Sequence, residues 1–406
     1  MSTPDTAGLT LSGVRLLDLS RMLAAPLCGQ VLGDFGAEVI KIEHPKRGDD
    51  TRDWGLRVGK TETAYFNSMN RNKRSITIDL QTAEGQQLVR DLASQCDVVL
   101  QNFKTGGVEK MGLGYEDMKA LKHDLIYCSV SGYDRHGAEA KRPGYDLVVQ
   151  GEAGLMAING EAGQAPLKFG VAVVDMFTGM YAAQAVLAAL FDRQRSGRGR
   201  HIEMALYDCG LMISAYYGLE ALLLQQDPPR YGNAHPSIVP YGVFDAQDGP
   251  LIIAVGNNAQ FERFCIDVIE RPDLAADARY KTNLVRGQNR DTLVPQLHQE
   301  LLARPRQLLL ERMGAVGIPC GEVLGLLEAL TSPRTIASGL VTQQPHPVAG
   351  TTHVMAPPYR LDGQRMPVRC APPQLGEATD EILGQWLGLD AARLLELKQL
   401  GVTGAI

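Results

Sequence analysis

GVRLLDLSRMLAAPLCGQVLGDFGAEVIKI, residues 13–42, is the stretch that decides the fold. Val14 to Asp18 is an apolar, β-type run, and Glu38 to Ile42 is a second one. Between them, the segment from about Pro26 to Asp34 has helical spacing and ends near Gly36. A strand, a helix and a second strand in this order predict a βαβ unit with parallel strands.

The same alternation continues through the first 200 residues. We expect further strands at Ser75–Asp79, Asp97–Gln101, Leu125–Val130 and His201–Ala205, and helices at Thr82–Ser94, Met176–Phe191 and Leu206–Gln225. This pattern predicts an α/β domain with a Rossmann-like parallel sheet covered by helices on both faces. Ligands bind such sheets beyond the carboxyl ends of the strands, so residues 19–26, 44–50 and 102–107 are expected at the binding edge.

The chain has 406 residues, more than one compact core usually holds, so we expect more than one domain. Residues 1–200 are predicted to form the large domain and 201–226 a linker helix. Residues 227–325 are expected to form a smaller α+β domain that opens with strands at Tyr241–Phe244 and Leu251–Val255. Residues 326–406 are a Pro-rich linker and a C-terminal segment with a helix at Thr379–Trp386.

Composition and missing motifs exclude several functions. The net charge of −6 gives no bulk electrostatic case for binding nucleic acid. No GxGxxG follows the first strand and no GxxxxGK[ST] occurs, which argues against dinucleotide and P-loop nucleotide binding. The seven cysteines have no CxxC spacing, the first residues have no signal-peptide pattern, and no apolar stretch is long enough for a membrane span. We expect a cytoplasmic protein without a metal site.

Asp175 ends the β-like run GVAVVD and stands where a helix begins. A carboxylate there can cap the helix. The helix dipole also favours its ionised form, which is suited to covalent catalysis. Near the predicted strand ends lies a basic cluster, either a solvated face or an electropositive rim for a phosphorylated ligand: Lys41, Lys46, Arg47, Arg52, Arg71, Lys73, Arg74, Lys104, Lys110, Lys141 and Arg142.

Ordered blocks along nearly the whole chain carry a resemblance. They include the stretch quoted above, NRNKRSITIDL, QNF with KMGLGY, SGY with RPGYDLVVQ, VVDMFTGMYAAQAVLAAL, SGRGRHIEMALYD, GIPCGEV and LGEATDEIL. The chain resembles the class III CoA-transferases, the formyl-CoA and carnitine CoA-transferase family, which also contains alpha-methylacyl-CoA racemases. The resemblance implies ring-shaped subunits, closed by return of the C-terminal segment to the large domain, in an interlocked homodimer.

The resemblance also implies a mechanism. The family's catalytic aspartate matches Asp175, which would form an acyl anhydride and then an aspartyl-CoA thioester. CoA thioesters are then substrates, and no tightly bound cofactor, metal, nucleic acid or membrane is implied. The matched CoA-binding positions are Leu23, Ala24, His44, Ile78, Asp79, Leu80, Asn102, Phe103, Lys104, Lys110 and Arg142.

Two positions bear on the substrate. The racemases have a histidine in their GHD motif, whereas this chain has Tyr145 in Gly-Tyr-Asp, and a phenol with a reference pKa of about 10 is a poor proton shuttle. No long Gly-rich loop of the oxalate-specific kind occurs near residues 230–260, where the segment with His235 stands. We therefore expect CoA transfer from succinyl-CoA to a short carboxylic or dicarboxylic acid, with Tyr145 and His235 as substrate contacts. The alternatives are a 2-methylacyl-CoA racemase and a non-catalytic CoA-binding protein.

Overall fold

The computed structural model describes residues 8–404. The expectation that the N-terminus is not a signal peptide concerns residues 1–7 in part, and these lie outside the described residues. Contacts divide the chain into two compact units: the first comprises Met1–Leu155, Lys168–Leu219 and Pro333–Ile406, and the second comprises Met156–Leu167 and Glu220–Ser332. Residues 156–167 thus belong to the second unit, although they lie within the first half of the sequence.

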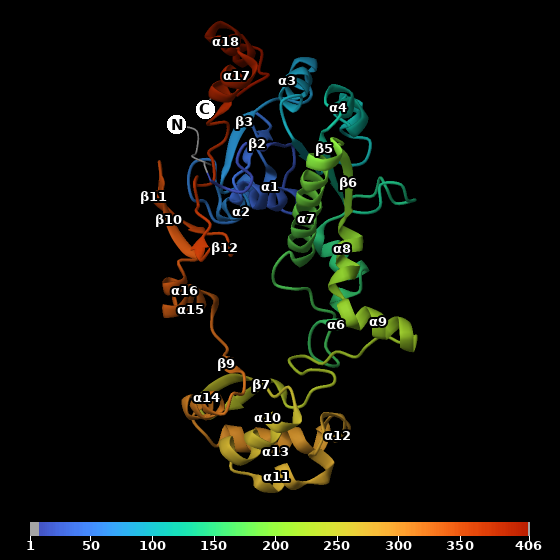
Figure 1. Ribbon diagram of the computed structural model, residues 1–406, viewed down its shortest axis with the longest axis vertical. Helices are drawn as coiled ribbons and strands as arrows, with labels where there is room; N and C mark the ends of the chain where they lie inside the picture. Colours follow the sequence, from blue (N-terminus) through green and yellow to red (C-terminus); the bar gives the residue numbers. More distant parts are fainter. Residues whose placement is uncertain (1–7, 405–406) are drawn as a thin grey trace. The chain divides into compact units, whose positions relative to one another are not determined.

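The first unit is built on a six-stranded parallel sheet with the order β3-β2-β1-β4-β5-β6 (Figure 1). This confirms the α/β fold with a parallel sheet. The order reverses between β1 and β4, which is where open α/β sheets form a crevice for ligands. The strands are β1 Arg15–Asp18, β2 Glu38–Glu43, β3 Lys73–Thr77, β4 Val98–Gln101, β5 Ile126–Ser131 and β6 Arg200–Ala205.

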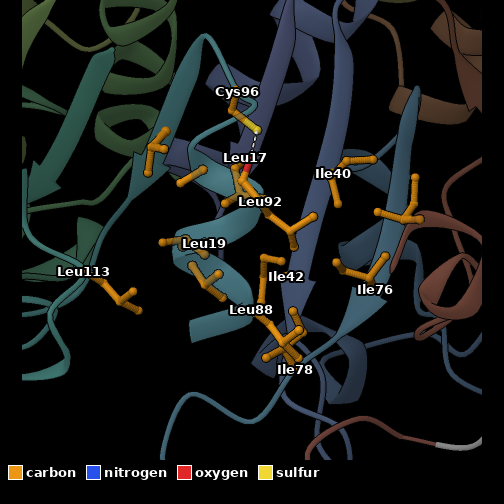
Figure 2. Close-up of a cluster of buried hydrophobic side chains, with 14 of the residues drawn as sticks. Leu17, Leu19, Ile40, Ile42, Ile76, Ile78, Leu88, Leu92, Cys96 and Leu113 are labelled. Atoms are coloured by element: carbon orange, nitrogen blue, oxygen red, sulfur yellow. Dashed lines mark hydrogen bonds between the residues drawn. The ribbon is translucent and has the colours of Figure 1, made fainter. Parts of the chain in front are cut away.

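Alternate strand residues pack against two helical layers. One layer joins strand residues such as Leu17, Ile40 and Ile76 to Leu88 and Leu92 of α3 (Figure 2). Cys96 lies in the same cluster, and its thiol donates to the carbonyl of Leu92 at 3.2 Å (Figure 2). The helices of this layer are α3 Ala83–Ala93, α4 Tyr115–Leu121, α17 Thr379–Leu387 and α18 Ala391–Gln399. Burying these side chains contributes about 1.5–3 kcal/mol each.

The other layer contains α1 Ala24–Asp34 and α7 Val173–Ser196, which pack against each other. Gly179 allows this close crossing, because a Cβ there would lie 2.5 Å from the carbonyl oxygen of Ala24. The small residues Ala182 and Ala183 are buried on the same helix. The expectation that no apolar stretch is long enough for a membrane span is wrong for α7, which alone within the described chain is long and apolar enough to cross a membrane. It contacts α1, β5 and β6 as a core helix does.

Two expectations about local structure are wrong. The run GVAVVD contains no strand: α7 begins at Val173, with Ala172 as its N-cap. The helix expected over Leu206–Gln225 is broken at Ala215, which has a positive φ of 47°. Apolar β-branched runs suit both strands and buried helix starts, so periodicity could not separate them.

The remaining elements of the first unit are short or lie near the C-terminus. Cys370 accepts a hydrogen bond from the Asn72 N–H at 3.1 Å, and Val402 accepts one from Asp79 at 2.8 Å, so the last residues close the edge beside β3. These elements are η1 Asp50–Asp53, α2 Ala64–Ser68, η2 Glu109–Met111, α5 Asp146–Glu152, α8 Leu206–Ile213, α16 Pro333–Ser338, β10 Val341–His346, β11 Gly350–Met355, β12 Arg360–Leu361 and β13 Gln364–Arg365. The boundary between the two units falls within two helices, α6 Leu155–Ile158 and α9 Ala215–Leu224.

The second unit has an antiparallel sheet, β7-β8-β9, packed with helices around its own apolar core. Arg286 is fully buried there and donates to the carbonyls of Val239 and Tyr280 at 2.7 and 2.9 Å. The elements are β7 Tyr241–Ala246, β8 Gly249–Ala254, α10 Asn258–Arg263, η3 Phe264–Val268, α11 Pro272–Ala276, η4 Ala278–Tyr280, α12 Asn283–Gln288, α13 Arg290–Leu302, α14 Arg306–Ala315, β9 Cys320–Glu322 and α15 Leu326–Thr331.

Candidate active site

A cavity of about 390 Å³ lies at the carboxyl edge of the parallel sheet, within the first unit. It is lined by residues 21–24 after β1, 102–105 after β4 and 130–132 at the end of β5. Asp50, Gly107, Ala140, residues 142–145, Asp175 and Leu206 complete the lining. The cavity therefore collects the loops that follow neighbouring strands, as expected of an open α/β sheet.

The loop before α1 is held rigidly against this cavity. Asn102 Nδ2 donates to the carbonyl of Arg21 at 2.7 Å, and its Oδ1 accepts from the Arg21 N–H at 3.0 Å. Met22 has a positive φ of 72°, a costly conformation for a residue with a side chain. The Met22 N–H donates to both carboxylate oxygens of the buried Asp49, each at 3.2 Å. The hydrogen bonds with Asn102 and Asp49 therefore stabilise the strained backbone of this loop, which forms part of the cavity wall.

The opposite wall depends on two glycines. A Cβ on Gly132 would lie 2.6 Å from the Cα of Gly144, so the loop after β5 and the loop before α5 touch through their backbones. This close approach brings Tyr145, the N-cap of α5, to the cavity, where its side chain is 56% exposed. Asp146 follows as the first residue of α5. The motifs that contain SGY and RPGYD therefore meet in space.

Asp175 lies in the first turn of α7, as the third helical residue rather than the N-cap. Asp146 Oδ1 accepts from the N–H groups of Val174 and Asp175 at 2.8 and 3.2 Å. Burial, followed by the negative charge of Asp146, raises the pKa of Asp175 to about 7. Strongly shifted carboxyl groups in cavities are enriched at functional sites, which makes Asp175 the candidate reactive residue.

Two residues that interact with Asp175 were not predicted as site residues. The sequence indicated Asp146 only as the last residue of the Gly-Tyr-Asp motif. Tyr65 in α2 was not singled out, yet burial and then the charges of Asp175 and Asp146 raise its pKa, so it lies within electrostatic reach of both. No local pattern in the sequence could have revealed either pairing.

The structure gathers some predicted site residues and leaves others apart. His44 uses its Nδ1 to accept from the N–H groups of Lys46 and Arg47 at 3.1 and 3.3 Å. His235 lies in the second unit, where its Nδ1 accepts from Ser237 at 3.1 Å. The predicted residues that line the cavity are Leu23, Ala24, Asn102, Phe103, Lys104, Arg142, Tyr145 and Asp175, whereas His44, Ile78, Asp79, Leu80, Lys110 and His235 are not part of its lining.

Much of the basic cluster is structural, so its interpretation as a ligand-binding rim is wrong for five of its members. Lys41 and Lys73 are fully buried, with Nζ 2.8 Å from Asp49 and 2.9 Å from Asp18. Three buried arginines pair in the same way: Arg52 with Glu43, Arg71 with Asp34, and Arg74 with Glu38 and Glu381. Cations that already neutralise buried carboxylates are not free to bind phosphate.

Three cations remain at the cavity. Arg21 lies 3.4 Å from Asp50, and Arg142 pairs with Glu139 at 2.6 Å and also with Glu152. Lys104 is exposed and has no ion-pair partner among residues 8–404. These side chains can attract phosphates or carboxylates of a ligand. Among the same residues, no group of three or more His, Cys, Asp or Glu side chains is arranged to hold a metal ion.

Comparison with known proteins identifies the class. The model of CoA-transferase family III matches residues 11–379, and the chain belongs to this family, which confirms the resemblance and the expected enzyme class. The chain is 37% identical over 392 residues to succinyl-CoA:glutarate CoA-transferase of Homo sapiens, covering 97% of this chain and 89% of the relative. It is 43% identical over 336 residues to succinate--glutarate CoA-transferase of Agrobacterium fabrum, covering 81% and 84%.

A solved structure agrees with the fold. The crystal structure of a CAIB/BAIF family protein from Brucella suis matches with a TM-score of 0.82 and 39% sequence identity. The match covers 93% of this chain and 99% of that one.

Proposed function

We propose that this enzyme transfers CoA from succinyl-CoA to a short dicarboxylic acid, with Asp175 as the covalent nucleophile. The observation that carries the proposal is the Asp175 carboxyl group, held at a helix N-terminus beside the cavity with its pKa raised to about 7. A carboxylate of raised basicity is a better nucleophile than an ordinary aspartate. The two relatives named above support succinyl-CoA as the donor and make glutarate the first acceptor to test.

The Asp175 carboxylate attacks the thioester carbonyl, the carbon–sulfur bond breaks, and CoA leaves as its thiolate. The product is a mixed anhydride between Asp175 and the donor acid. The thiolate then attacks the aspartyl carbonyl, which forms an aspartyl-CoA thioester and releases the donor carboxylate. The acceptor carboxylate attacks the carbonyl of this thioester, the carbon–sulfur bond breaks, and CoA thiolate leaves, which gives a second anhydride. Attack of the thiolate on the acceptor's acyl carbon yields the new acyl-CoA and frees Asp175.

The cavity suits these steps. The anhydrides and the thioester are prone to hydrolysis, so water must be excluded while they exist. Leu23, Ala24 and Phe103 supply an apolar part of the wall, and Lys104 and Arg142 can attract the CoA phosphates or an acceptor carboxylate. Tyr145 is proposed to contact substrate from the same wall. For His44, Ile78, Asp79, Leu80 and Lys110 as CoA contacts, and for His235 as a substrate contact, the role stays a prediction.

The assembly belongs to the proposal as well. We infer a cytoplasmic, interlocked homodimer of ring-shaped subunits, as the family resemblance implies. Exposed leucines on α9 support an interface: Leu222, Leu223 and Leu224 are 69%, 82% and 72% exposed. A run of large apolar side chains left in water is a mark of a protein contact surface.

Trapping of the covalent intermediate tests the mechanism. Incubation with succinyl-CoA and then borohydride or hydroxylamine should modify Asp175, which peptide mass spectrometry would show. An unmodified Asp175, together with full transferase activity of Asp175→Ala, would exclude the mechanism. A screen of acceptor acids against succinyl-CoA, beginning with glutarate, identifies the second substrate. Exchange of an alpha-proton with deuterated water in the absence of transfer would instead favour a racemase.

A further inference from the structure

Asp146 connects two helix N-termini beside the reactive carboxylate. It is the first residue of α5, and its Oδ1 reaches across to the first turn of α7. Its Oδ2 accepts from the side chain of Gln150 at 2.7 Å. The carboxylate therefore receives three N–H donors from neutral groups, two of which belong to the turn that carries Asp175.

The beginning of α7 depends on this outside help. The N-cap, Ala172, has no side-chain acceptor. The Val173 N–H donates to the Val171 carbonyl at 2.9 Å, but the next two N–H groups, those of Val174 and Asp175, need an acceptor from outside the helix. Asp146 supplies the missing acceptor from α5. Gln150, which is 1% exposed, holds the segment before the helix, because its Oε1 accepts from the Phe169 N–H at 2.9 Å. The pair formed by Asp146 and Gln150 thus fixes both the first turn of α7 and the segment that leads into it.

We propose that Asp146 is the positioning residue of the Asp175 nucleophile: it caps the first turn of α7 from a neighbouring helix and places a second negative charge beside Asp175. The catalytic part of this inference rests on the function proposed above. The two carboxylates repel each other in the free enzyme. When Asp175 becomes an anhydride or a thioester, its charge disappears and the repulsion ends. Asp146 thereby favours the covalent states over the free carboxylate.

Other titratable and charged groups also contribute to the electrostatic potential at Asp175. Tyr65 of α2 lies within electrostatic reach of both carboxylates, whose charges raise its pKa. The other titratable or charged groups of the same cavity are Arg21, Asp50, Lys104, Arg142 and Tyr145. Because the Asp146 carboxylate is bonded to the Asp175 N–H itself, its removal is the most direct way to test the charge beside the nucleophile.

Two substitutions separate the charge of Asp146 from its hydrogen bonds. Asp146→Asn keeps an oxygen that can accept from the turn but removes the charge, so the acid limb of the kcat/KM profile should move to lower pH by about one unit. Asp146→Ala removes both, so kcat should also fall at every pH, on the order of tenfold to hundredfold, because the nucleophile is misplaced. Asp91→Asn, which removes a carboxylate from α3 of the same unit, is the matched control and should leave the profile unchanged.

A chemical titration provides a readout that does not require activity. A water-soluble carbodiimide modifies protonated carboxyl groups, and peptide mass spectrometry follows the modification of Asp175 against pH. The midpoint should fall in Asp146→Asn and stay unchanged in Asp91→Asn. If Asp146→Ala does not fold, as judged by its melting temperature, Asp146→Glu replaces it. That variant keeps the charge but displaces it, so kcat should fall while the acid limb stays in place.

The outcomes distinguish the two proposals. The inference would be overturned if Asp146→Asn and the wild-type enzyme had the same pH profile of kcat/KM and the same carbodiimide midpoint. Full kcat in Asp146→Ala would overturn it as well. Full transfer by Asp175→Asn would instead overturn the proposed function. In that case the carbodiimide midpoint still decides whether Asp146 sets the protonation of Asp175.

Discussion

Two groups of carboxylates in the same unit have opposite electrostatic surroundings. Beneath the sheet edge, Asp18 pairs with Lys73 and Asp49 pairs with Lys41, at 2.9 and 2.8 Å. Burial alone would raise the pKa of both acids, but the lysine charges prevail: the pKa of Asp18 is lowered and that of Asp49 falls to about 2. These acids stay ionised at any physiological pH and serve the architecture.

The second group lies at the start of α7. Asp175 is also partly withdrawn from water, but its charged neighbour is Asp146, so the pKa rises to about 7 instead of falling. The difference lies in the partner and not in the residue type. A carboxylate neutralised by a lysine is stable and unreactive, whereas one kept beside another carboxylate is basic and available for chemistry.

Replacement of the reactive carboxylate should have the largest effect. Asp175→Asn should lower kcat by about 10³-fold or more, because the nucleophile is lost. The same change should stabilise the fold at pH 8 by about 1–3 kcal/mol. The sign follows from the raised pKa: ionisation of Asp175 opposes folding fully above about pH 7, and this opposition decreases as the pH falls from about 7 and is gone below the unfolded value of 3.8. Urea unfolding at pH 8 and pH 5 measures it, and a less stable variant at pH 8 would contradict the comparison.

Breaking a structural ion pair should instead destabilise the fold. Lys73→Met leaves Asp18 buried without its main partner and should cost about 3–5 kcal/mol of unfolding free energy. Arg57→Met, which breaks the exposed pair with Asp53, is the matched control and should cost less than about 1 kcal/mol. Denaturant midpoints measure both. Equal losses in the two variants would remove the distinction between the two groups of carboxylates.

The pH dependence of catalysis should report the ionisation of Asp175. Attack requires the ionised form of Asp175, so kcat/KM should fall about tenfold per pH unit once the pH drops below about 7. A profile that stays flat down to pH 5 would mean that Asp175 titrates like an ordinary aspartate. The paired acids should make no contribution in this range, since their pKa values lie far below it.

The smallest expected effect concerns the clamp on the cavity wall. Asn102→Ala removes both hydrogen bonds to the Arg21 backbone and should raise KM for the acyl-CoA about tenfold. The kcat should change less, because Asp175 is untouched. Asn159→Ala, in the second unit, is the control and should change neither constant. Unchanged KM in Asn102→Ala would show that the loop keeps its shape without the clamp.

Local patterns predicted the scaffold well. The expected strand Val14–Asp18 is β1 at Arg15–Asp18, and the helix expected at Thr82–Ser94 is α3 at Ala83–Ala93. Asp175 was found because a family motif surrounds it. Periodicity failed at GVAVVD, where an apolar run serves the start of a helix.

Long-range pairings could not be predicted. The contact of Lys73 with Asp18 joins residues 55 positions apart, and that of Asp146 with the Asp175 N–H joins residues 29 apart. A basic residue near a strand end gives the same sequence pattern whether it is buried in an ion pair or exposed to a ligand. The charge state of a buried site depends on these partners, so the sequence shows which residues are present but not which are neutralised.

The first unit is discontinuous, and the end of the chain completes it. The Asp79 N–H donates to Val402, and the Gly404 N–H donates to the Thr77 hydroxyl at 3.0 Å. On the ribosome, most of the smaller unit emerges as one continuous run, Glu220–Ser332, while the larger unit still lacks Pro333–Ile406. A nascent chain therefore carries a finished small unit and an unfinished large one, with the edge beside β3 open. Limited proteolysis of a chain that ends before Thr379 should digest the large unit and spare the small one.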